Sequence, residues 1–167
     1  MPAEALAEID ARFGALPRPW LVLGLGASHP DKDWPDEQWC ALLQEIARNS
    51  QGATFIIGGP SLQARADRVI AAAGVGAFNA CDLPIMKSAA LCKRADLFVG
   101  ADSGALNLAA AVGTTAYGLF GLTPALDYSR HIHIIRTGDH PGPMREITAQ
   151  RVHSTISAAL KDRQPPR

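Results

Sequence analysis

Apolar residues recur along this chain in short continuous runs, and the stretches between the runs have the periodicity of amphipathic helices. Runs that are apolar almost throughout are typical of strands covered on both faces, and they lie at 20–25, 54–57, 96–100 and 115–120. Shorter extended segments are expected near 75–79 and 131–136. The helices predicted between them extend from 4 to 13, 36 to about 49, 61 to about 73, 84 to about 94, 103 to 112, and 147 to 160. This alternation requires right-handed crossovers, so we expect an α/β fold with a single Rossmann-like, doubly wound parallel sheet.

The division of the 167 residues follows from the same pattern, because their number suits one domain of ordinary size. We expect a linker-like segment with a short helix at 1–19, the domain proper at 20–160 and a flexible polar tail at 161–167. The stretch from Ser103 to Leu126 has no charged residue and is long enough to span a bilayer. Because four glycines divide it, we interpret it as a short buried helix, a Gly-Thr-Thr turn and a buried strand.

Charge and composition exclude several classes of function. Sixteen basic and sixteen acidic residues give no net charge, which argues against a nucleic-acid partner and against a polybasic membrane anchor. The acidic N-terminus has no apolar core of a signal peptide, so we expect a cytoplasmic protein. The three cysteines are too widely spaced for a disulfide framework, and we expect buried, reduced thiols. The five histidines have no zinc-binding spacing, so no metal is expected.

Glycine-rich and polar clusters follow four of the predicted strands, at Gly26–Pro35, Gly58–Gln63, Asp102–Gly104 and Gly121–Pro124. All four lie at carboxyl ends of strands, the edge of a parallel sheet where ligands bind. Three of them lead into helix N-termini, whose free N–H groups and positive dipole ends suit a phosphate. The clusters therefore predict a site for a nucleotide or another phosphorylated ligand.

Each cluster also has a purely structural interpretation. Gly58-Gly59-Pro60 is good turn chemistry, and Asp102-Ser103-Gly104 would serve as a helix cap. Lys32 would be an ordinary solvated lysine, and Trp34 is better explained as a hydrophobic staple on the following helix than as a stacking surface. Neither G-x-G-x-x-G nor G-x-x-x-x-G-K-[ST] is present, so the dinucleotide-binding and P-loop hypotheses have no specific support.

Together these segments resemble glycosyltransferase family 9, the ADP-heptose:lipopolysaccharide heptosyltransferases. Gly26-Ala-Ser28 with Lys32-Asp-Trp-Pro35 looks like the family segment G-A-S…K-x-W-P, and Ile57–Pro60 looks like its G-G-P loop. The segment from Arg94 to Gly121, RADLFVGADSGALNLAAAVGTTAYGLFG, is similar to the family's R-A-D-L-V-V-G-x-D-S-G-P-M-H-L-A-A-A-L-G-T-P-x-x-x-L-F-G. Met144–Thr148 also looks like the family's segment before its last helix, and the resemblance runs from about residue 20 to 160.

The resemblance implies a GT-B fold, of which this chain is similar to the C-terminal, donor-binding half. It implies an ADP-activated sugar as ligand and no metal or other cofactor. By carry-over, Ser28 and Lys32 would hold the diphosphate beside the loop of Gly58 and Gly59. The other expected donor contacts are Gln63 near the ribose, Asp102, Ser103 and Gly104 at the sugar and phosphates, and Thr123 in a loop that closes over the donor.

The departures from the family pattern leave alternatives open. Asn107 stands where the family usually has His, Leu122–Ala125 replaces P-T-D-P, and Pro143 replaces a frequent Cys. The resemblance places the catalytic base in an N-terminal acceptor domain, which we expect to be missing or separate here. The expected partners are therefore the nucleotide-sugar donor and that domain, with at most peripheral membrane association through it. The alternatives are a non-catalytic nucleotide-binding or interaction module of the same fold, and the donor domain of another GT-B enzyme using a UDP-sugar.

Overall fold

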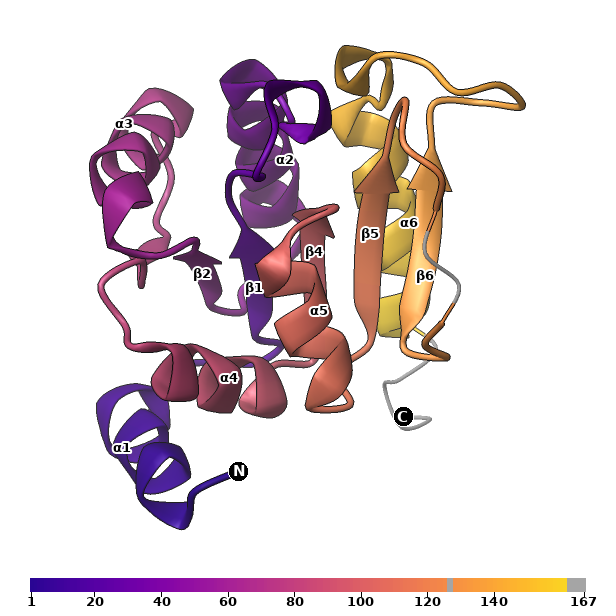
Figure 1. The fold of residues 1–167 in the computed structure, drawn as a ribbon. Helices are drawn as coiled ribbons and strands as arrows, with labels where there is room; N and C mark the ends of the chain where they lie inside the picture. The colour runs from indigo at the N-terminus through magenta and orange to yellow at the C-terminus, as the bar shows by residue number, and fades with distance from the viewer. Residues whose placement is uncertain (126–127, 162–167) are drawn as a thin grey trace.

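The computed structural model describes residues 1–125 and 128–161, which form one α/β unit around a six-stranded sheet (Figure 1). The strands are β1 (Leu21–Gly24), β2 (Thr54–Ile57), β3 (Phe78–Asn79), β4 (Leu97–Ala101), β5 (Ala116–Phe120) and β6 (Ile132–Arg136). The helices are α1 (Ala3–Phe13), α2 (Asp36–Asn49), α3 (Gln63–Ala73), α4 (Ile85–Arg94), α5 (Gly104–Ala111) and α6 (Ala149–Lys161). Short 3-10 helices span Pro30–Lys32, Pro60–Leu62 and Met144–Glu146. The predicted elements are thus all present, and the predicted fold class is confirmed.

All strand pairs are parallel, in the order β3-β2-β1-β4-β5-β6. This is the strand order of a doubly wound Rossmann-like sheet, in which the direction of winding reverses between β1 and β4. The sequence segment without charges forms α5 and β5, as expected. Among the residues that the structure describes, no helix combines the length and the hydropathy that a membrane span requires.

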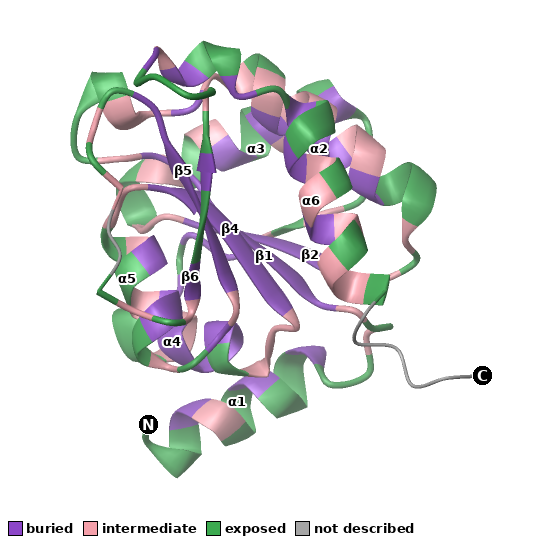
Figure 2. Cartoon of the chain, turned by 90° about the vertical axis from the view of Figure 1, so that its right-hand side faces the viewer, coloured by how far each residue is buried: buried purple, intermediate pink, exposed green. Residues whose placement is uncertain are grey.

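Helices cover both faces of the sheet, and Figure 2 shows the buried strands between the two helical layers. One core lies under α2, α3 and α6 and includes Trp34, Trp39 and Leu43; the other lies under α1, α4 and α5 and includes Ile9, Phe13 and Phe55. Burial of β1, β2, β4 and β5 on both faces explains why their sequences are apolar without alternation.

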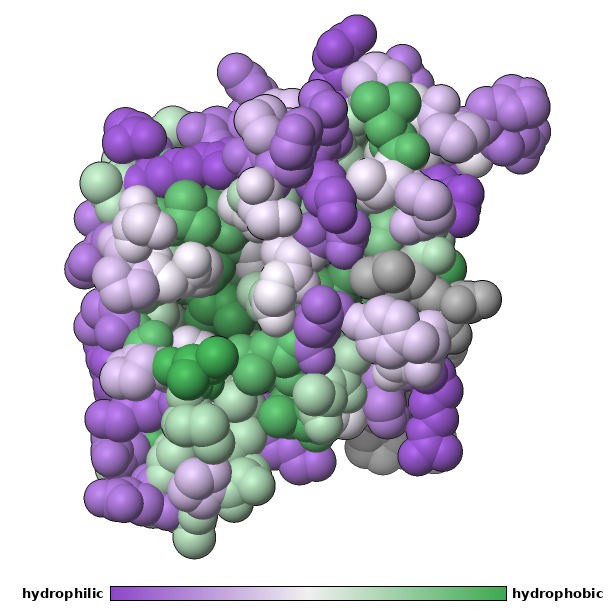
Figure 3. Space-filling view, viewed as in Figure 1, coloured by the Kyte–Doolittle hydropathy of each residue, from purple (hydrophilic) through white to green (hydrophobic). Residues whose placement is uncertain are grey.

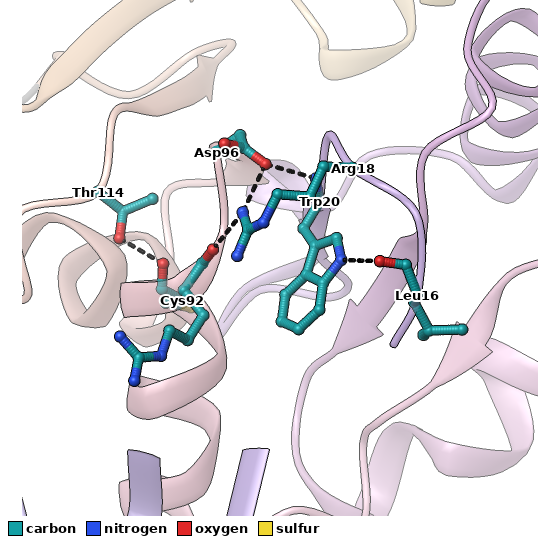
Figure 4. A network of polar contacts seen from close by, with 7 residues as sticks. Leu16, Arg18, Trp20, Cys92, Asp96 and Thr114 are labelled. Atoms are coloured by element: carbon teal, nitrogen blue, oxygen red, sulfur yellow. Dashed lines mark hydrogen bonds and ion pairs between the residues drawn. The ribbon is translucent and has the colours of Figure 1, made fainter. Parts of the chain in front are cut away.

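The start of the sheet is fixed by a polar cluster around Asp96 (Figure 4). Asp96 Oδ2 accepts hydrogen bonds from the backbone N–H of Trp20 at 2.7 Å and from Arg18 Nη1 at 2.8 Å. Arg18 also donates to the carbonyl of Arg94 at 2.9 Å, and Trp20 Nε1 donates to the carbonyl of Leu16 at 3.3 Å. The segment between α1 and β1 is therefore tied to the beginning of β4.

Two helix starts refine the sequence prediction. The helix predicted to begin at residue 61 starts later, because Ser61 lies within a 3-10 turn that Pro60 initiates, and α3 begins after Leu62. At α2 the staple is confirmed: Trp34 precedes the N-cap Pro35 and packs edge-on against Trp39, with ring centroids 4.7 Å apart. Trp34 Nε1 also donates to the carbonyl of Ile147 at 2.9 Å, which joins this loop to the start of α6.

Candidate functional site

A cleft of about 890 Å³ lies at the carboxyl edge of the sheet, where the loops after β1, β2, β3 and β4 meet. Figure 3 shows the hollow on one face of the molecule, with hydrophobic residues at its floor and lower rim. Its wall includes five of the predicted site residues, namely Ser28, Gly58, Gly59, Ser103 and Gly104. Residues separated by more than seventy positions in the sequence therefore share one cavity at the point where the winding of the sheet reverses, which is where open α/β sheets bind ligands.

The N-terminus of α5 is the part of this cleft whose chemistry best suits an anion. Ser103 occupies the N-cap position in an extended conformation, but its hydroxyl makes no capping bond. Ser103 Oγ is buried and lacks a hydrogen-bond partner among the described residues, so a strong hydrogen-bonding group remains available there. A Cβ at Gly104 would meet nothing within 4 Å, so the first turn of α5 opens into free space. Its free N–H groups and the helix dipole favour a negative charge at this point.

A row of glycines brings α5 close to the sheet. Gly24, Gly100 and Gly118 pair in register across β1, β4 and β5. A Cβ at Gly24 would lie 2.5 Å from the ring of Phe98, and one at Gly118 would lie 2.9 Å from Leu106 of α5. The glycines therefore leave room for ring and helix side chains that hold the α5 N-terminus over the ends of β1 and β4.

Glycines also shape the floor of the cleft. Gly26 and Gly59 have φ values of +80° and +87°, in the left-handed region that glycine enters most easily. A Cβ at Gly58 would lie 2.7 Å from the carbonyl oxygen of Leu25, so the loops after β1 and β2 approach each other as closely as backbone allows. Gly58 and Gly59 therefore form the tight turn that the structural interpretation predicts, and this turn also lines the cleft.

Lys32 and Asp102 form an ion pair across the two central loops, with Lys32 Nζ 2.6 Å from Asp102 Oδ2. Their side chains are 28% and 12% exposed, so Lys32 is not the solvated lysine of the structural interpretation. Neither residue lines the cleft directly, but Asp102 adjoins Ser103, which does. The ion pair therefore links the loop after β1 to the loop that leads into α5.

Arg65 of α3 holds the loop that carries Lys32. It donates from Nη1 to Asp33 Oδ2 at 2.6 Å, from Nε to Asp36 Oδ1 at 2.7 Å and from Nη2 to the carbonyl of Trp34 at 3.2 Å. Burial lowers the pKa of Arg65, but hydrogen bonds and charges of Asp33 and Asp36 outweigh it, so the pKa is raised and the guanidinium stays charged. Arg65 carries no motif that marks it in the sequence, and only the tertiary structure identifies it.

Besides Lys32 and Asp102, two further predicted residues lie away from the cleft wall. Gln63 is exposed at the start of α3, where its carbonyl accepts a hydrogen bond from Asn79 Nδ2 at 2.9 Å. Thr123 lies in the loop after β5 and is not among the lining residues. Asn107, by contrast, lines the cleft from α5, and its Oδ1 accepts a hydrogen bond from the hydroxyl of Tyr128 in the β5–β6 connection.

Sequence reasoning missed one wall of the cleft. It is formed by the connection from β3 to α4 and the first turns of α4, with the lining residues Asp82, Leu83, Pro84, Ile85 and Ser88. This segment has neither the glycines nor the motif likeness that mark the other loops. Its position follows only from the strand order, which places β3 beside β2 at the edge of the sheet.

The comparisons with known proteins agree on the fold. The chain is 20% identical to E. coli ADP-heptose lipopolysaccharide heptosyltransferase II, with a TM-score of 0.81 over 97% of this chain and 53% of that one. For the glycosyltransferase family 9 protein of Veillonella parvula, the identity is 18% and the TM-score 0.84, with the same coverage. For E. coli heptosyltransferase WaaC with ADP-2-deoxy-2-fluoro heptose, the values are 23% and 0.70, over 88% and 46%. The chain thus spans about half the length of these relatives, and no curated protein sequence matches it.

The family assignment rests on the amino-acid sequence. The model of glycosyltransferase family 9 (heptosyltransferase) matches residues 3–146, which include every lining residue of the cleft. That match extends over most of the chain, and the GT-B heptosyltransferase structures share its sheet and helices. The chain therefore belongs to glycosyltransferase family 9.

Proposed function

We propose that this chain is the donor-binding domain of a heptosyltransferase-like inverting glycosyltransferase, and that it binds an ADP-activated sugar in the cleft above β1 and β4. The observation that carries the proposal is the buried, unpartnered Ser103 Oγ beside the open N-terminus of α5. The hydroxyl of Ser103 adjoins the free N–H groups of the first turn of α5, a combination of donors that suits a phosphate group. The sugar transfer that we propose serves the synthesis of lipopolysaccharide or a related glycan, as the names of the matched E. coli enzymes suggest.

The chemistry required of such a domain is stabilisation of the leaving group. When the sugar departs, the nucleoside diphosphate gains negative charge, and prearranged donors lower the energy of that state without any reorganisation. The α5 N–H groups and Ser103 would supply these donors, with Lys32 as the nearby cation. We propose that the carboxylate acting as base belongs to a partner domain, because this chain spans about half the length of the matched heptosyltransferases. The three free cysteines support a reducing compartment, the cytoplasm.

A substitution at Gly104 gives the sharpest test of this site. In Gly104→Asp the new carboxylate would stand in open space at the first turn of α5, where it complements the helix dipole and should not disturb the fold. The same carboxylate would repel a diphosphate. Isothermal titration calorimetry of the whole chain should show ADP binding by the wild type and none by Gly104→Asp. Gly138→Asp is the matched control, since a Cβ at Gly138 also meets nothing within 4 Å and Gly138 does not line the cleft.

The alternatives give different results in the same assay. A preference for UDP over ADP would indicate the donor domain of another GT-B enzyme. Binding of ADP without sugar transfer, even after addition of an acceptor domain, would indicate a non-catalytic nucleotide-binding module. Absence of any heat with ADP, UDP and GDP at millimolar concentration, from a chain whose circular dichroism is that of a folded α/β protein, would refute nucleotide binding altogether.

A further inference from the structure

A second cavity, of about 730 Å³, lies at the amino edge of the sheet. It is formed by the segment before β1, the turn after α2 and one side of α6, and it shares no lining residue with the cleft. Leu21 at the start of β1 lines this amino-edge cavity, whereas Leu25, just beyond the end of β1, lines the cleft. Four residues of a strand span roughly 13 Å, so the two cavities are separate. The volume is within the range of about 300–1,000 Å³ that ligand sites occupy.

The ionisable side chains around the amino-edge cavity are all basic. Arg18, His153 and Lys161 belong to its wall, and no acidic residue of the described part of the chain lines it. The position of Lys161 is explained by the dipole of α6, which favours a cation at the helix C-terminus. Arg18 precedes β1, and His153 lies about two turns before the end of α6, so this explanation does not extend to them. In a chain without net charge, such a wall indicates a site for an anion.

Arg18 is oriented by residues that do not line the cavity (Figure 4). Its Nη1 donates to Asp96 Oδ2 and to the carbonyl of Arg94, and its Cζ lies over the ring of Trp20, 4.6 Å from the centroid. The Arg18 side chain is nevertheless 51% exposed. Because the guanidinium is already held in one orientation, it loses little conformational freedom when it binds a phosphate. Asp96 offsets part of the Arg18 charge, so an anion in the cavity also requires Lys161.

The neutral polar groups of the cavity suit the hydroxyl groups of a sugar. Amide and hydroxyl side chains both donate and accept hydrogen bonds, and five of them line the cavity, namely Asn49, Ser50, Gln51, Ser154 and Ser157. The helices α2 and α6 also end at this cavity, and the last carbonyls of a helix have no partner within it. A sugar hydroxyl can donate to such a carbonyl, whereas an ionised phosphate only accepts. A ligand that carries both groups therefore fits the two kinds of wall.

The same lining residues argue against a nucleotide and against a lipid surface. No aromatic residue of the described part of the chain lines the cavity, so a nucleotide base finds no ring on which to stack. None of the exposed large hydrophobic residues in that part lines the cavity either, so the rim has no apolar side chains that would enter a bilayer. Leu21, Ile46 and Ile156 are buried and line the cavity, and they offer apolar surface to the C–H groups of a sugar ring.

We propose that the amino-edge cavity binds a soluble phosphorylated sugar, whose phosphate meets the basic side chains and whose hydroxyl groups meet the amides, the serines and the helix-end carbonyls. The inference does not rest on the proposed function, because it uses other residues at the opposite edge of the sheet. The chain is then expected to hold a nucleotide in the cleft and a sugar phosphate in the amino-edge cavity at the same time.

Isothermal titration calorimetry of the whole chain with glucose 1-phosphate, glucose 6-phosphate, glucose and inorganic phosphate tests this site. At least one glucose phosphate should bind, and glucose and inorganic phosphate should bind about tenfold more weakly, since each lacks one set of contacts. Lys161→Met should weaken binding of the glucose phosphate by a similar factor. Ser154→Asp places a carboxylate at an exposed position of the wall and should abolish it. Gln150→Asp makes the same charge change at an exposed position of α6 outside the cavity, and is the matched control.

Titrations with ADP separate this inference from the proposed function. A glucose phosphate that binds equally well to the free and the ADP-saturated chain supports a second site, and one that binds to a chain without affinity for ADP refutes only the proposed function. If ADP displaces the glucose phosphate and Ser154→Asp still binds it, the sugar phosphate lies in the cleft and the inference is wrong. Equal affinity for inorganic phosphate would overturn the assignment to a sugar. A folded chain that gives no heat with either glucose phosphate would overturn the site itself, whatever the result with ADP.

Discussion

Lys32 Nζ lies 2.6 Å from Asp102 Oδ2, although the two residues are 70 positions apart in the sequence. They belong to the loops that leave β1 and β4, the neighbouring strands between which the winding of the sheet reverses. The pair therefore couples the two loops that frame the proposed phosphate position. Asp102 neutralises Lys32 in this pair, and a diphosphate would compete with Asp102 for the lysine.

This competition predicts opposite effects of substitutions on the two sides of the pair. Lys32→Met should weaken ADP binding about tenfold or more, because it removes a charge-assisted contact while Asp102 stays to repel the phosphates. Asp102→Asn should leave ADP affinity unchanged or raise it, since Lys32 then has no competing partner. The dissociation constants are measured by calorimetry at two salt concentrations, and the Lys32 effect should shrink at the higher one.

Lys93→Met is the matched control for Lys32→Met. Lys93 donates to the carbonyl of Val112 at 2.9 Å at the C-terminal end of α4, outside the cleft. Equal losses of ADP affinity in the two lysine variants would mean that only the net charge of the chain matters, and a specific role for Lys32 would be excluded.

Arg65 is predicted to stabilise the loop that carries Lys32. Arg65→Met keeps most of the side-chain volume but leaves Asp33 and Asp36 without their shared partner, in a site where the arginine is 18% exposed. Loss of one member of a partly buried pair should cost about 2 kcal/mol of the free energy of unfolding, less than for a fully buried pair. Urea denaturation measures the change. Arg48→Met removes only an exposed pair with Glu45 and should cost less than about 0.5 kcal/mol.

The sequence could predict which loops line one end of the cleft, because the signals of these loops are local. Glycine and serine at the ends of apolar runs mark turns into helices, and the alternation of strands and helices brings all such turns to one edge of a parallel sheet. The approximate position of Ser28, Gly58, Ser103 and Gly104 therefore follows without knowledge of the strand order. The helix α3 began later than expected because Pro60 starts a separate 3-10 turn, a choice that Ser61 alone does not indicate.

The rest of the site depends on relationships that no local pattern encodes. Asp82 lines the cleft only because β3, a strand of two residues, pairs with β2 at the sheet edge. Arg65 looks like an ordinary charged residue on a helix, and its three acceptors lie about thirty residues away in the sequence. Gln63 was expected beside the ligand from its motif position, yet the first turn of α3 leaves it exposed and away from the cleft wall.

The cysteines give a prediction about reactivity and pH. Burial, together with the charges of Asp67 and Asp82, raises the pKa of Cys81 to about 11, and burial raises that of Cys92 to about 12. Burial and the nearby Asp36 and Glu37 also raise the pKa of the half-buried Cys40. Since the thiolate is the reactive form, alkylation by iodoacetamide at pH 8 should be slow for Cys40 and negligible for the other two.

Mass spectrometry of the alkylated protein would count the modified thiols over time. The native chain should gain one adduct slowly, and the chain in guanidinium chloride should gain three rapidly, because unfolding restores the ordinary pKa of each thiol. The reaction of Cys40 should accelerate as the pH rises, since a raised pKa means that deprotonation continues above pH 8. Rapid native labelling of Cys92 would contradict the burial that places it in the core under α4.

The substitution Phe13→Ala tests whether α1 is part of this domain or belongs to a linker that adds little to its stability. The side chain of Phe13 is 5% exposed and meets the rings of Phe55 and Phe78 edge-on, with centroids 5.0 and 6.0 Å away. Truncation to alanine would remove these contacts and leave a cavity between α1 and the sheet, which typically costs about 3 kcal/mol.

Urea denaturation followed by the fluorescence of the buried tryptophans measures that cost. If α1 is integral to the fold, Phe13→Ala lowers the midpoint and the single transition is kept, because Phe13 packs on Phe55 of β2, a buried strand that pairs with β1 and β3. If α1 is only a linker, Phe13→Ala changes the midpoint no more than Ala7→Ser, an exposed substitution on the same helix. We expect the first result, since α1 is held not only by Phe13 but also by the ion pair of Asp10 with Arg94 and by the contact of Glu8 with Lys87.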